Sequence, residues 1–383
     1  MPGFFIPNKN WMRKDRIIIV GGGLAGLTAA IHLAQKGQKI ILFEKDTFPH
    51  HKVCGEYLSR EVKPYLDDLG VQLSKLQPKI IDKLLYSTLS GRSVHVDLPL
   101  GAFGISRFAL DDLFYETAKE NGVEVIQEKV LAINYLENHF KVITSKEEYL
   151  ADFVLGSFGK RSLLDKNLGR KFFKEPAPWV AVKSHYRLKD FPEDLVALHN
   201  FNGGYCGLSR TESGDINMCY LATYESFKQH KDPGKFNEKV LRKNPFLDSF
   251  LAEACPVFEQ PLTIAQISFS KKEAVEDHVL MLGDAAGLIH PLCGNGMAIA
   301  IHSAKIASEE ILKHIEKGSS REKMELAYRQ RWKKTFSGRF TTAGWLQKIL
   351  LREKLAEVSQ TLISGLPFLL PKLIKQTHGE PIE

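Results

Sequence analysis

The chain has 383 residues, enough for a sizeable core, and its 44% hydrophobic and 25% charged residues are typical of soluble proteins. Its 52 basic and 45 acidic residues give a net charge of +7 without a dominant basic block, which argues against nucleic-acid binding. Five widely spaced cysteines with no Cys-x-x-Cys pair indicate a reducing, cytoplasmic setting and argue against disulfides and against a metal site.

A strand, a helix and a second strand are predicted at residues 16–44. The glycine motif Gly21-x-Gly23-x-x-Gly26 lies where the first strand ends and the helix begins. Glycines at these positions allow a tight turn, close approach of a pyrophosphate and close packing of the helix, whose N-terminus attracts anions. Glu44 follows about 20 residues on, where a carboxylate binds an adenosine ribose and repels the 2′-phosphate of NADP. We therefore predict a dinucleotide site.

A polar loop at residues 45–58 comes next, and a helix is expected from about Ser59. The loop gathers two histidines, a lysine, a thiol and a carboxylate close to the dinucleotide strand. His51 and Lys52 would favour a thiolate at Cys54. The alternative is a solvated loop without a chemical role.

The following elements alternate between strands and helices. In chain order we expect a hairpin at 81–96, a helix at 107–120, a strand at 123–126, an antiparallel meander at 129–149 and a buried strand at 152–156.

Short alternating runs dominate residues 176–267. They predict a mostly antiparallel sheet with one face covered, which is a plausible layer for holding a substrate. One helix is expected between them, at about 236–254.

Residues 279–297 return to the pattern of strand, glycine turn and helix. Asp284 at the strand end can accept two hydrogen bonds from a polyol, and its alternative role is a helix N-cap. The segment Gly294-Asn295-Gly296 offers main-chain N–H groups to an anion. His290 is either a proton donor or a turn histidine bonded to the backbone.

The remaining cysteines and the C-terminal region are expected mainly to have structural roles. Cys293, Cys206, Cys219 and Cys255 are expected in the core. Helices are expected at 321–334 and 341–358. The apolar and basic tail at 362–375 is too short to span a bilayer, and it either lies on a membrane surface or caps the core. No signal peptide or spanning segment is expected.

The motifs occur in an order that resembles a known superfamily. Gly21-x-Gly23-x-x-Gly26 with Glu44, Arg107 before a helix, and Gly283-Asp284 followed by Pro291-x-x-Gly294-x-Gly296 resemble the FAD-dependent aromatic hydroxylases and geranylgeranyl reductases, which share the fold of para-hydroxybenzoate hydroxylase. The resemblance covers the chain to about residue 320. Lys52-x-Cys54-Gly55-Glu56 is similar to a loop of the geranylgeranyl reductase branch, and Tyr205 lies in a similar Gly-Tyr segment.

This resemblance implies a role for each motif. The glycines would hold the FAD pyrophosphate beside Arg107, while Glu44 would bind the adenosine ribose and Asp284 the ribityl or ribose hydroxyls. Residues 294–296 would stabilise negative charge on the reduced flavin. Cys54, Glu56 and Tyr205 would be the catalytic residues, shaping the substrate site or giving a proton. The residues expected to bind the cofactor are Gly21, Gly23, Leu24, Ala25, Gly26, Glu44, Lys45, Lys52, Cys54, Gly55, Arg107, Gly283, Asp284, Pro291, Gly294, Asn295 and Gly296.

Two departures from the family pattern bear on the reaction. Phe158 stands where many flavin hydroxylases carry the Asp of an Asp-Gly pair that touches both FAD and the nicotinamide. The reductant is therefore either NAD(P)H or a separate electron-donor protein. Trp179 stands alone, without the Trp-x-Trp signature of flavin halogenases, which argues against halogenation.

We therefore predict an FAD-dependent oxidoreductase that reduces a double bond of a large apolar substrate, such as an isoprenoid, polyene or phenolic lipid. The alternative is a flavin-dependent monooxygenase that hydroxylates an aromatic or lipid-like substrate through a C4a-hydroperoxide. A third hypothesis is a redox sensor without turnover, against which the strand-rich middle region argues.

The predicted fold class is α/β, with a Rossmann-type FAD-binding domain, an inserted, mostly antiparallel substrate domain and a helical C-terminal region. The expected boundaries are 1–80, 104–165 and 269–320 for the FAD-binding parts, 81–103 for a substrate-domain hairpin, 166–268 for the substrate domain and 321–383 for the helical region.

Overall fold

The computed structural model describes residues 16–350, 374, 376 and 378–383. Its N-terminal strand lies in the middle of a six-stranded sheet, which is parallel except for one edge strand. In spatial order the strands are β17 (Val275–Glu276), β18 (Val279–Met281), β10 (Phe153–Gly156), β1 (Arg16–Val20), β2 (Lys39–Glu44) and β6 (Glu124–Gln127).

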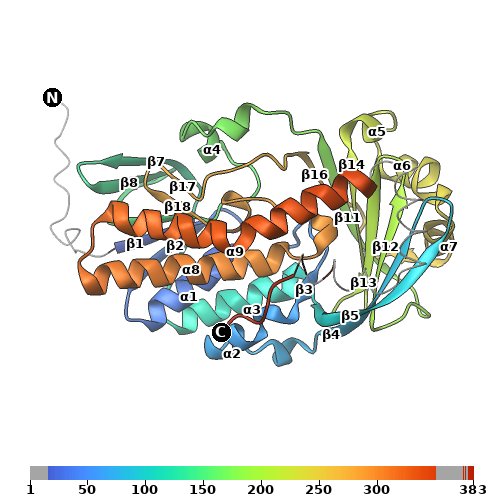
Figure 1. Cartoon of the computed structure of the whole chain (residues 1–383), viewed down its shortest axis with the longest axis horizontal. Coiled ribbons are helices and arrows are strands. Elements are labelled where there is room, and N and C mark those ends of the chain that lie inside the picture. Colours follow the sequence, from blue (N-terminus) through green and yellow to red (C-terminus); the bar gives the residue numbers. More distant parts are fainter. Residues whose placement is uncertain (1–15, 351–373, 375, 377) are drawn as a thin grey trace.

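The two faces of this sheet are covered differently because side chains alternate along each strand. Ile17 and Ile19 of β1 pack toward helices, and Ile18 and Val20 pack toward a small antiparallel sheet. The helices lie side by side in Figure 1. They are α1 (Leu24–Gln35), α3 (Arg107–Glu120), α8 (Gly296–Lys317) and α9 (Arg321–Leu350); the small sheet comprises β7 (Val130–Leu136), β8 (His139–Thr144) and β9 (Glu148–Ala151).

A second, nine-stranded sheet stands beside the first and is antiparallel except where β12 pairs with β4. Its spatial order is β15 (Cys255–Pro256), β11 (Trp179–Arg187), β14 (Ile216–Thr223), β13 (Gly204–Arg210), β12 (Leu195–Phe201), β4 (Lys79–Ser87), β5 (Ser93–Gly104) and β3 (Tyr57–Ser59), with β16 (Leu262–Ile267) also paired to β11.

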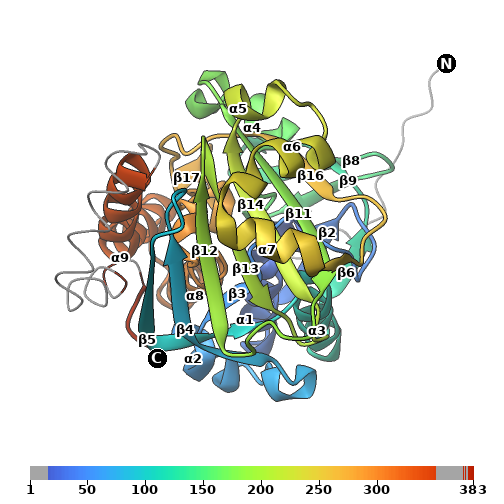
Figure 2. The same ribbon diagram turned by 90° about the vertical axis from the view of Figure 1, so that its right-hand side faces the viewer.

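Short helices cover the outer face of the nine-stranded sheet (Figure 2). They are α5 (Tyr224–Lys228), α6 (Pro233–Lys239) and α7 (Pro245–Glu253). Val180 and Val182 of β11 pack in the core beneath them, whereas Ala181 and Lys183 point to the inner face. The inner face is therefore free to form the wall of a site.

The helix expected at 236–254 is wrong as a single element. It is divided by a 3₁₀ turn, Leu241–Lys243, and by Asn244, whose side chain accepts a hydrogen bond from the Phe246 N–H and begins α7 anew. Pro245 at the first position of α7 restricts the residue before it to an extended backbone.

The C-terminal helices expected at 321–334 and 341–358 are instead one helix, α9, as far as Leu350. An isolated glycine, Gly338, is tolerated there because Phe336 and Arg339 on either side are buried and hold the helix in place. Nearly all of the predicted tail at 362–375 lies outside the described residues. Within the described part of the chain, no helix is long and apolar enough to cross a membrane. The remaining helical segments are α2 (Lys63–Asp68), α4 (Leu163–Asn167) and the 3₁₀ turns Arg60–Val62, Leu73–Leu76, Lys171–Lys174, Gly283–Ala285 and Pro291–Cys293.

Candidate functional site

A cavity of about 900 Å³ lies between the six-stranded sheet and the inner face of the nine-stranded sheet. This volume is within the range of small-molecule and cofactor sites. Of the residues predicted to form the site, Gly26 and Asn295 do not line it. Those that do are Gly21, Gly23, Leu24, Ala25, Glu44, Lys45, Lys52, Cys54, Gly55, Glu56, Arg107, Tyr205, Gly283, Asp284, Pro291, Gly294 and Gly296.

The turn between β1 and α1 has the shape that a pyrophosphate needs. A Cβ at Gly26 would lie 2.0 Å from the carbonyl oxygen of Gly21, so only glycine lets helix and turn pack this closely. A Cβ at Gly23 would meet nothing nearer than Arg107 Nη2 at 3.9 Å, which leaves the helix N-terminus open to the cavity. No side chain caps α1. An anionic group therefore fits between the α1 N–H groups and the Arg107 guanidinium.

Glu44 is held in place by the main chain at the end of β2. Its Oε2 accepts a hydrogen bond of 2.7 Å from the Gly22 N–H, and its Oε1 accepts bonds from the Lys45 and Asp46 N–H groups at 2.8 and 3.1 Å. Each carboxylate oxygen offers about two acceptor positions, so Oε1 is fully used and Oε2 keeps one. The side chain is thus fixed at the cavity edge and can still accept a ribose hydroxyl.

The loop after β18 presents Asp284 to the same cavity. Its carboxylate does not cap the short 3₁₀ helix Gly283–Ala285, so the alternative role as an N-cap is not seen. Lys272, which the sequence analysis did not single out, donates hydrogen bonds of 2.7 Å to the Asp284 carbonyl and 2.6 Å to the Lys160 carbonyl. Burial lowers the pKa of Lys272 to about 8. Its ammonium holds the two loops together.

Asn295 points away from the cavity, toward a buried carboxylate. Its Nδ2 lies 3.4 Å from Glu61 Oε2, and Glu61 also accepts hydrogen bonds from Arg339 Nη1 at 2.8 Å and from the Gly379 N–H at 2.6 Å. The C-terminal residues are therefore fastened behind the loop whose neighbours Gly294 and Gly296 face the cavity.

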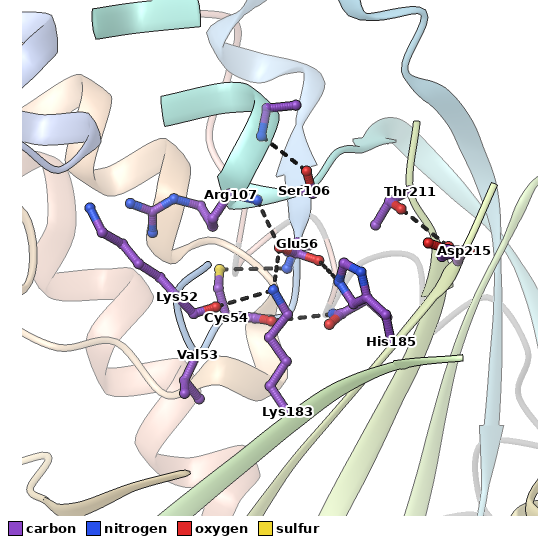
Figure 3. Close-up of polar contacts among 12 residues, drawn as sticks. Lys52, Val53, Cys54, Glu56, Ser106, Arg107, Lys183, His185, Thr211 and Asp215 are labelled. Atoms are coloured by element: carbon purple, nitrogen blue, oxygen red, sulfur yellow. Dashed lines mark hydrogen bonds and ion pairs between the residues drawn. The ribbon is translucent and has the colours of Figure 1, made fainter. Parts of the chain in front are cut away.

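Glu56 is the centre of a buried ionic network (Figure 3). Its Oε1 accepts a hydrogen bond of 2.7 Å from the Arg107 N–H and also contacts Lys183 Nζ, while its Oε2 lies 2.7 Å from His185 Nε2. Glu56 and Lys183 are both fully buried. Lys183 Nζ also donates to the Lys52 carbonyl at 3.2 Å. The network joins the loop, α3 and β11.

The charges in this network favour an anion at Glu56. Burial alone would raise the pKa of Glu56, but the hydrogen bond from His185 and the charge of Lys183 outweigh it and hold the pKa below its usual range. Such a carboxylate is poorly suited to giving a proton. His51, Glu56 and His185 have ligand atoms within 4.8 Å of one another. The Lys183 ammonium already balances the negative charge of Glu56, so we interpret the three residues as part of this ionic network.

Lys52 and Arg107 share a second buried carboxylate beside Cys54. Asp111 bonds Lys52 Nζ at 2.8 Å and Arg107 Nε and Nη2 at 2.7 Å each. Burial would raise the pKa of Asp111, but Arg107 and Lys52 outweigh it and lower the pKa. The Cys54 Sγ accepts a long hydrogen bond, 3.5 Å, from the Glu56 N–H. Lys52, which was expected to favour a thiolate at Cys54, is thus paired with Asp111.

Tyr205 lines the cavity, and its ring packs near the buried His290, which does not line the cavity itself. Tyr205 is 7% exposed, and its hydroxyl has no hydrogen-bond partner among the described residues. Its ring lies 5.6 Å from that of His290, which also contacts Trp179 and Phe269. Both ring nitrogens of His290 are buried and lack partners in the described chain, so the expected bond to the backbone is not seen. Burial lowers the pKa of His290 to about 3.

The other cysteines differ from one another. Cys206 and Cys293 are buried as expected, and burial raises the pKa of Cys293 to about 12. Cys219 lines the cavity. The expectation for Cys255 is wrong: it is exposed, because β15 is a two-residue strand at the sheet edge.

Sequence reasoning missed Lys183 and His185, which complete the Glu56 network. A signal was present: the two polar side chains stand two apart on a mostly apolar strand, which places them on one face. Their partner could not be inferred from spacing, because Glu56 lies 127 and 129 residues away in sequence.

Comparisons with known proteins bear on the fold and on the class of cofactor. A protein family model described as an FAD binding domain matches residues 14–335. The chain is 24% identical over 315 residues to the menaquinone reductase of Mycobacterium tuberculosis (strain ATCC 25618 / H37Rv), covering 76% of this chain and 75% of that protein. It is 25% identical over 385 residues to the chloroplastic geranylgeranyl diphosphate reductase of Arabidopsis thaliana, covering 89% and 75%. The solved structure of the flavin-dependent brominase Bmp2 matches with a TM-score of 0.77 and 18% identity, covering 94% and 93%.

Proposed function

Because this chain belongs to the FAD binding domain family, we propose that it is a reductase that saturates a double bond of a sizeable apolar substrate. FAD is its cofactor, and it is an FAD-dependent oxidoreductase, as the motifs predicted. The names of two relatives say that they reduce menaquinone and geranylgeranyl diphosphate, which supports an isoprenoid or similar lipid as substrate class here. The likeness to the brominase concerns the fold alone.

We propose that the cofactor is held by the residues described above. The open N-terminus of α1 and Arg107 would hold the pyrophosphate, Glu44 the adenosine ribose, and Asp284 the hydroxyls of the polyol chain. When bound and reduced, FAD would supply the hydride, with NAD(P)H or a separate donor protein as the reductant.

The Tyr205 hydroxyl carries the proposal. The hydroxyl is buried and unpartnered among the described residues, and Tyr205 lines the cavity next to the loop that precedes α8. Burial raises the pKa of Tyr205 well above 10, so the hydroxyl is protonated before the reaction. We propose that it gives this proton to the carbon that does not receive the hydride, and that the tyrosinate regains a proton from solvent when the product leaves. The apolar neighbours Leu221, Ile267 and Leu288 keep water out.

The test uses FAD-loaded protein, photoreduced without oxygen and mixed with geranylgeranyl diphosphate or menaquinone. We expect the absorbance of oxidised flavin to return and two hydrogen atoms to be added across a C=C bond of the prenyl chain, which distinguishes this reaction from reduction of the menaquinone ring to the quinol. Tyr205→Phe should slow this step by about 10²-fold or more with unchanged FAD affinity. Tyr186→Phe, on the outer face of the same sheet, is the control and should leave the rate unchanged.

Two results would contradict the proposal. If neither probe reoxidises the flavin without oxygen, and oxygen is instead incorporated into a phenolic lipid, the chain is a monooxygenase. If Tyr205→Phe reacts as fast as the wild type, the proton comes from another group.

A further inference from the structure

One glycine on the inner face of the nine-stranded sheet lacks a structural reason. Gly207 of β13 lies opposite Leu198 of β12 and opposite Cys219 of β14. Leu198 in turn lies opposite Tyr86 of β4. Cys219, Gly207, Leu198 and Tyr86 therefore form a row across four strands, and all four line the cavity. The row is roughly 14 Å long, because neighbouring strands are about 4.8 Å apart.

The backbone does not require glycine at this position. Gly207 is absent from the residues with positive φ, and a Cβ there would meet Leu198 Cδ2 at 3.5 Å and the Cys219 carbonyl oxygen at 3.7 Å, which are ordinary contacts. Gly204 in the same strand is different, since its Cβ would lie 2.0 Å from the Leu221 carbonyl oxygen. A glycine inside a strand costs about 0.5–1 kcal/mol relative to alanine and often marks close approach of a ligand.

The surroundings of Gly207 indicate what approaches it. Tyr205 and Ser209 stand two positions away on the same face of β13, and beyond Leu198 the wall continues through Val196 and Leu84. Trp345 and Ile349 of α9 line the same cavity. A chain lying along the row would thus run from Cys219 past Gly207 and Leu198 toward Tyr86.

We propose that Gly207 determines substrate specificity by leaving a low point in the cavity wall, where an extended apolar chain crosses the strands. This inference rests on the proposed function and deepens it: the substrate carries a flexible apolar tail that continues beyond the double bond reduced near Tyr205. A compact aromatic ring would make no additional contacts in a depression that continues along the row.

The test compares Gly207→Ala and Gly207→Leu with Gly338→Leu in FAD-loaded protein. Gly338 lies on α9 outside the cavity, is exposed, and a Cβ there meets nothing within 4 Å, so this variant adds the same side chain elsewhere. The substrates are prenyl diphosphates of increasing length, assayed by anaerobic reoxidation of the reduced flavin. We expect Gly207→Leu to raise KM for the longest chain by about tenfold or more and to leave the shortest within about twofold. Gly207→Ala should lie between, and Gly338→Leu should match the wild type.

An equal rise in KM for short and long chains in Gly207→Leu would overturn the proposal, because it would indicate a distorted sheet. An unchanged KM for the longest chain would overturn it as well.

A second readout separates this inference from the reaction itself. Binding of straight-chain fatty alcohols is measured by the change in flavin fluorescence of the oxidised, FAD-loaded protein. If the wild type reduces no prenyl compound but binds long alcohols at least about tenfold more tightly than Gly207→Leu does, Gly207 keeps its role and the reaction class is wrong. If the two bind all lengths equally, Gly207 does not set chain length.

Discussion

Removing the Lys183 ammonium should leave Glu56 as a buried carboxylate without its charge partner. Both side chains are fully buried, so water cannot replace the lost contact. Two donors remain, His185 Nε2 and the Arg107 N–H, each at 2.7 Å. Breaking a buried ion pair from one side costs about 3–5 kcal/mol, and we expect Lys183→Met to lower the free energy of unfolding by that amount at pH 8.

The cost should depend on pH in a defined direction. In the wild type the pKa of Glu56 is lowered on folding, so this group contributes stability above its ordinary pKa of 4.5 and loses it as the pH falls below that. In Lys183→Met the charge of Lys183 no longer opposes burial, and the pKa of Glu56 rises. As the pH falls, Glu56 of the variant takes up a proton, and the cost of the unpaired buried charge is removed. The difference between wild type and variant should therefore shrink from pH 8 to pH 5.

Equilibrium urea unfolding at fixed free FAD measures both effects, with circular dichroism as the signal. The double variant Glu56→Gln/Lys183→Met removes both charges and should recover much of the stability lost in the single variant. Lys228→Met breaks an exposed ion pair and should not move the midpoint. A loss below about 1 kcal/mol that does not change with pH would refute the reasoning.

Three further predictions follow from single contacts. Asp284→Ala should weaken FAD binding by at least about tenfold and give colourless protein on purification, measured by flavin fluorescence titration; a fully yellow variant with unchanged affinity would mean that the Asp284 loop is misplaced. Under native conditions iodoacetamide should label the exposed Cys255 and leave the buried Cys206 and Cys293 unlabelled, because burial keeps them as thiols; peptide mass analysis that finds Cys293 modified first would contradict this. Glu61→Gln should speed hydrogen exchange at the Gly379 amide, whose acceptor is the Glu61 carboxylate, and an unchanged exchange rate would show that the C-terminal residues are held by other contacts.

The dinucleotide half of the site is largely local in sequence, which is why it could be predicted. The glycine turn and Asp284 follow strands of the parallel sheet and Glu44 ends another, and the carboxyl ends of parallel strands meet at one edge of the sheet. The division of the helix expected at 236–254 was also readable, since Asn244 before Pro245 is a capping signal that a purely apolar period overlooks. The continuity of α9 could not be predicted from the sequence, because it depends on tertiary contacts that anchor Phe336 and Arg339.

The substrate half depends on pairings between distant strands, and a single sequence does not specify them. The row that contains Gly207 exists only because β12 lies between β13 and β4, an arrangement that joins residues more than a hundred positions apart. The glycine itself carries no visible signal, since a turn glycine and a pocket glycine look alike in sequence. Only the space around its absent Cβ distinguishes Gly207 from Gly204.

The Glu56 network links these two halves through one short loop. Lys52 and Cys54 are on the dinucleotide side with Arg107 and Asp111, while Lys183 and His185 come from the wall that would hold the substrate. Loosening the network should therefore change the distance between the substrate wall and the cofactor. It should change the cofactor site itself less, because the glycine turn is held by its own packing. Lys183→Met should accordingly lower the rate of double-bond reduction by a larger factor than it lowers FAD affinity. A variant that loses FAD first would show that the loop supports the cofactor and not the substrate wall.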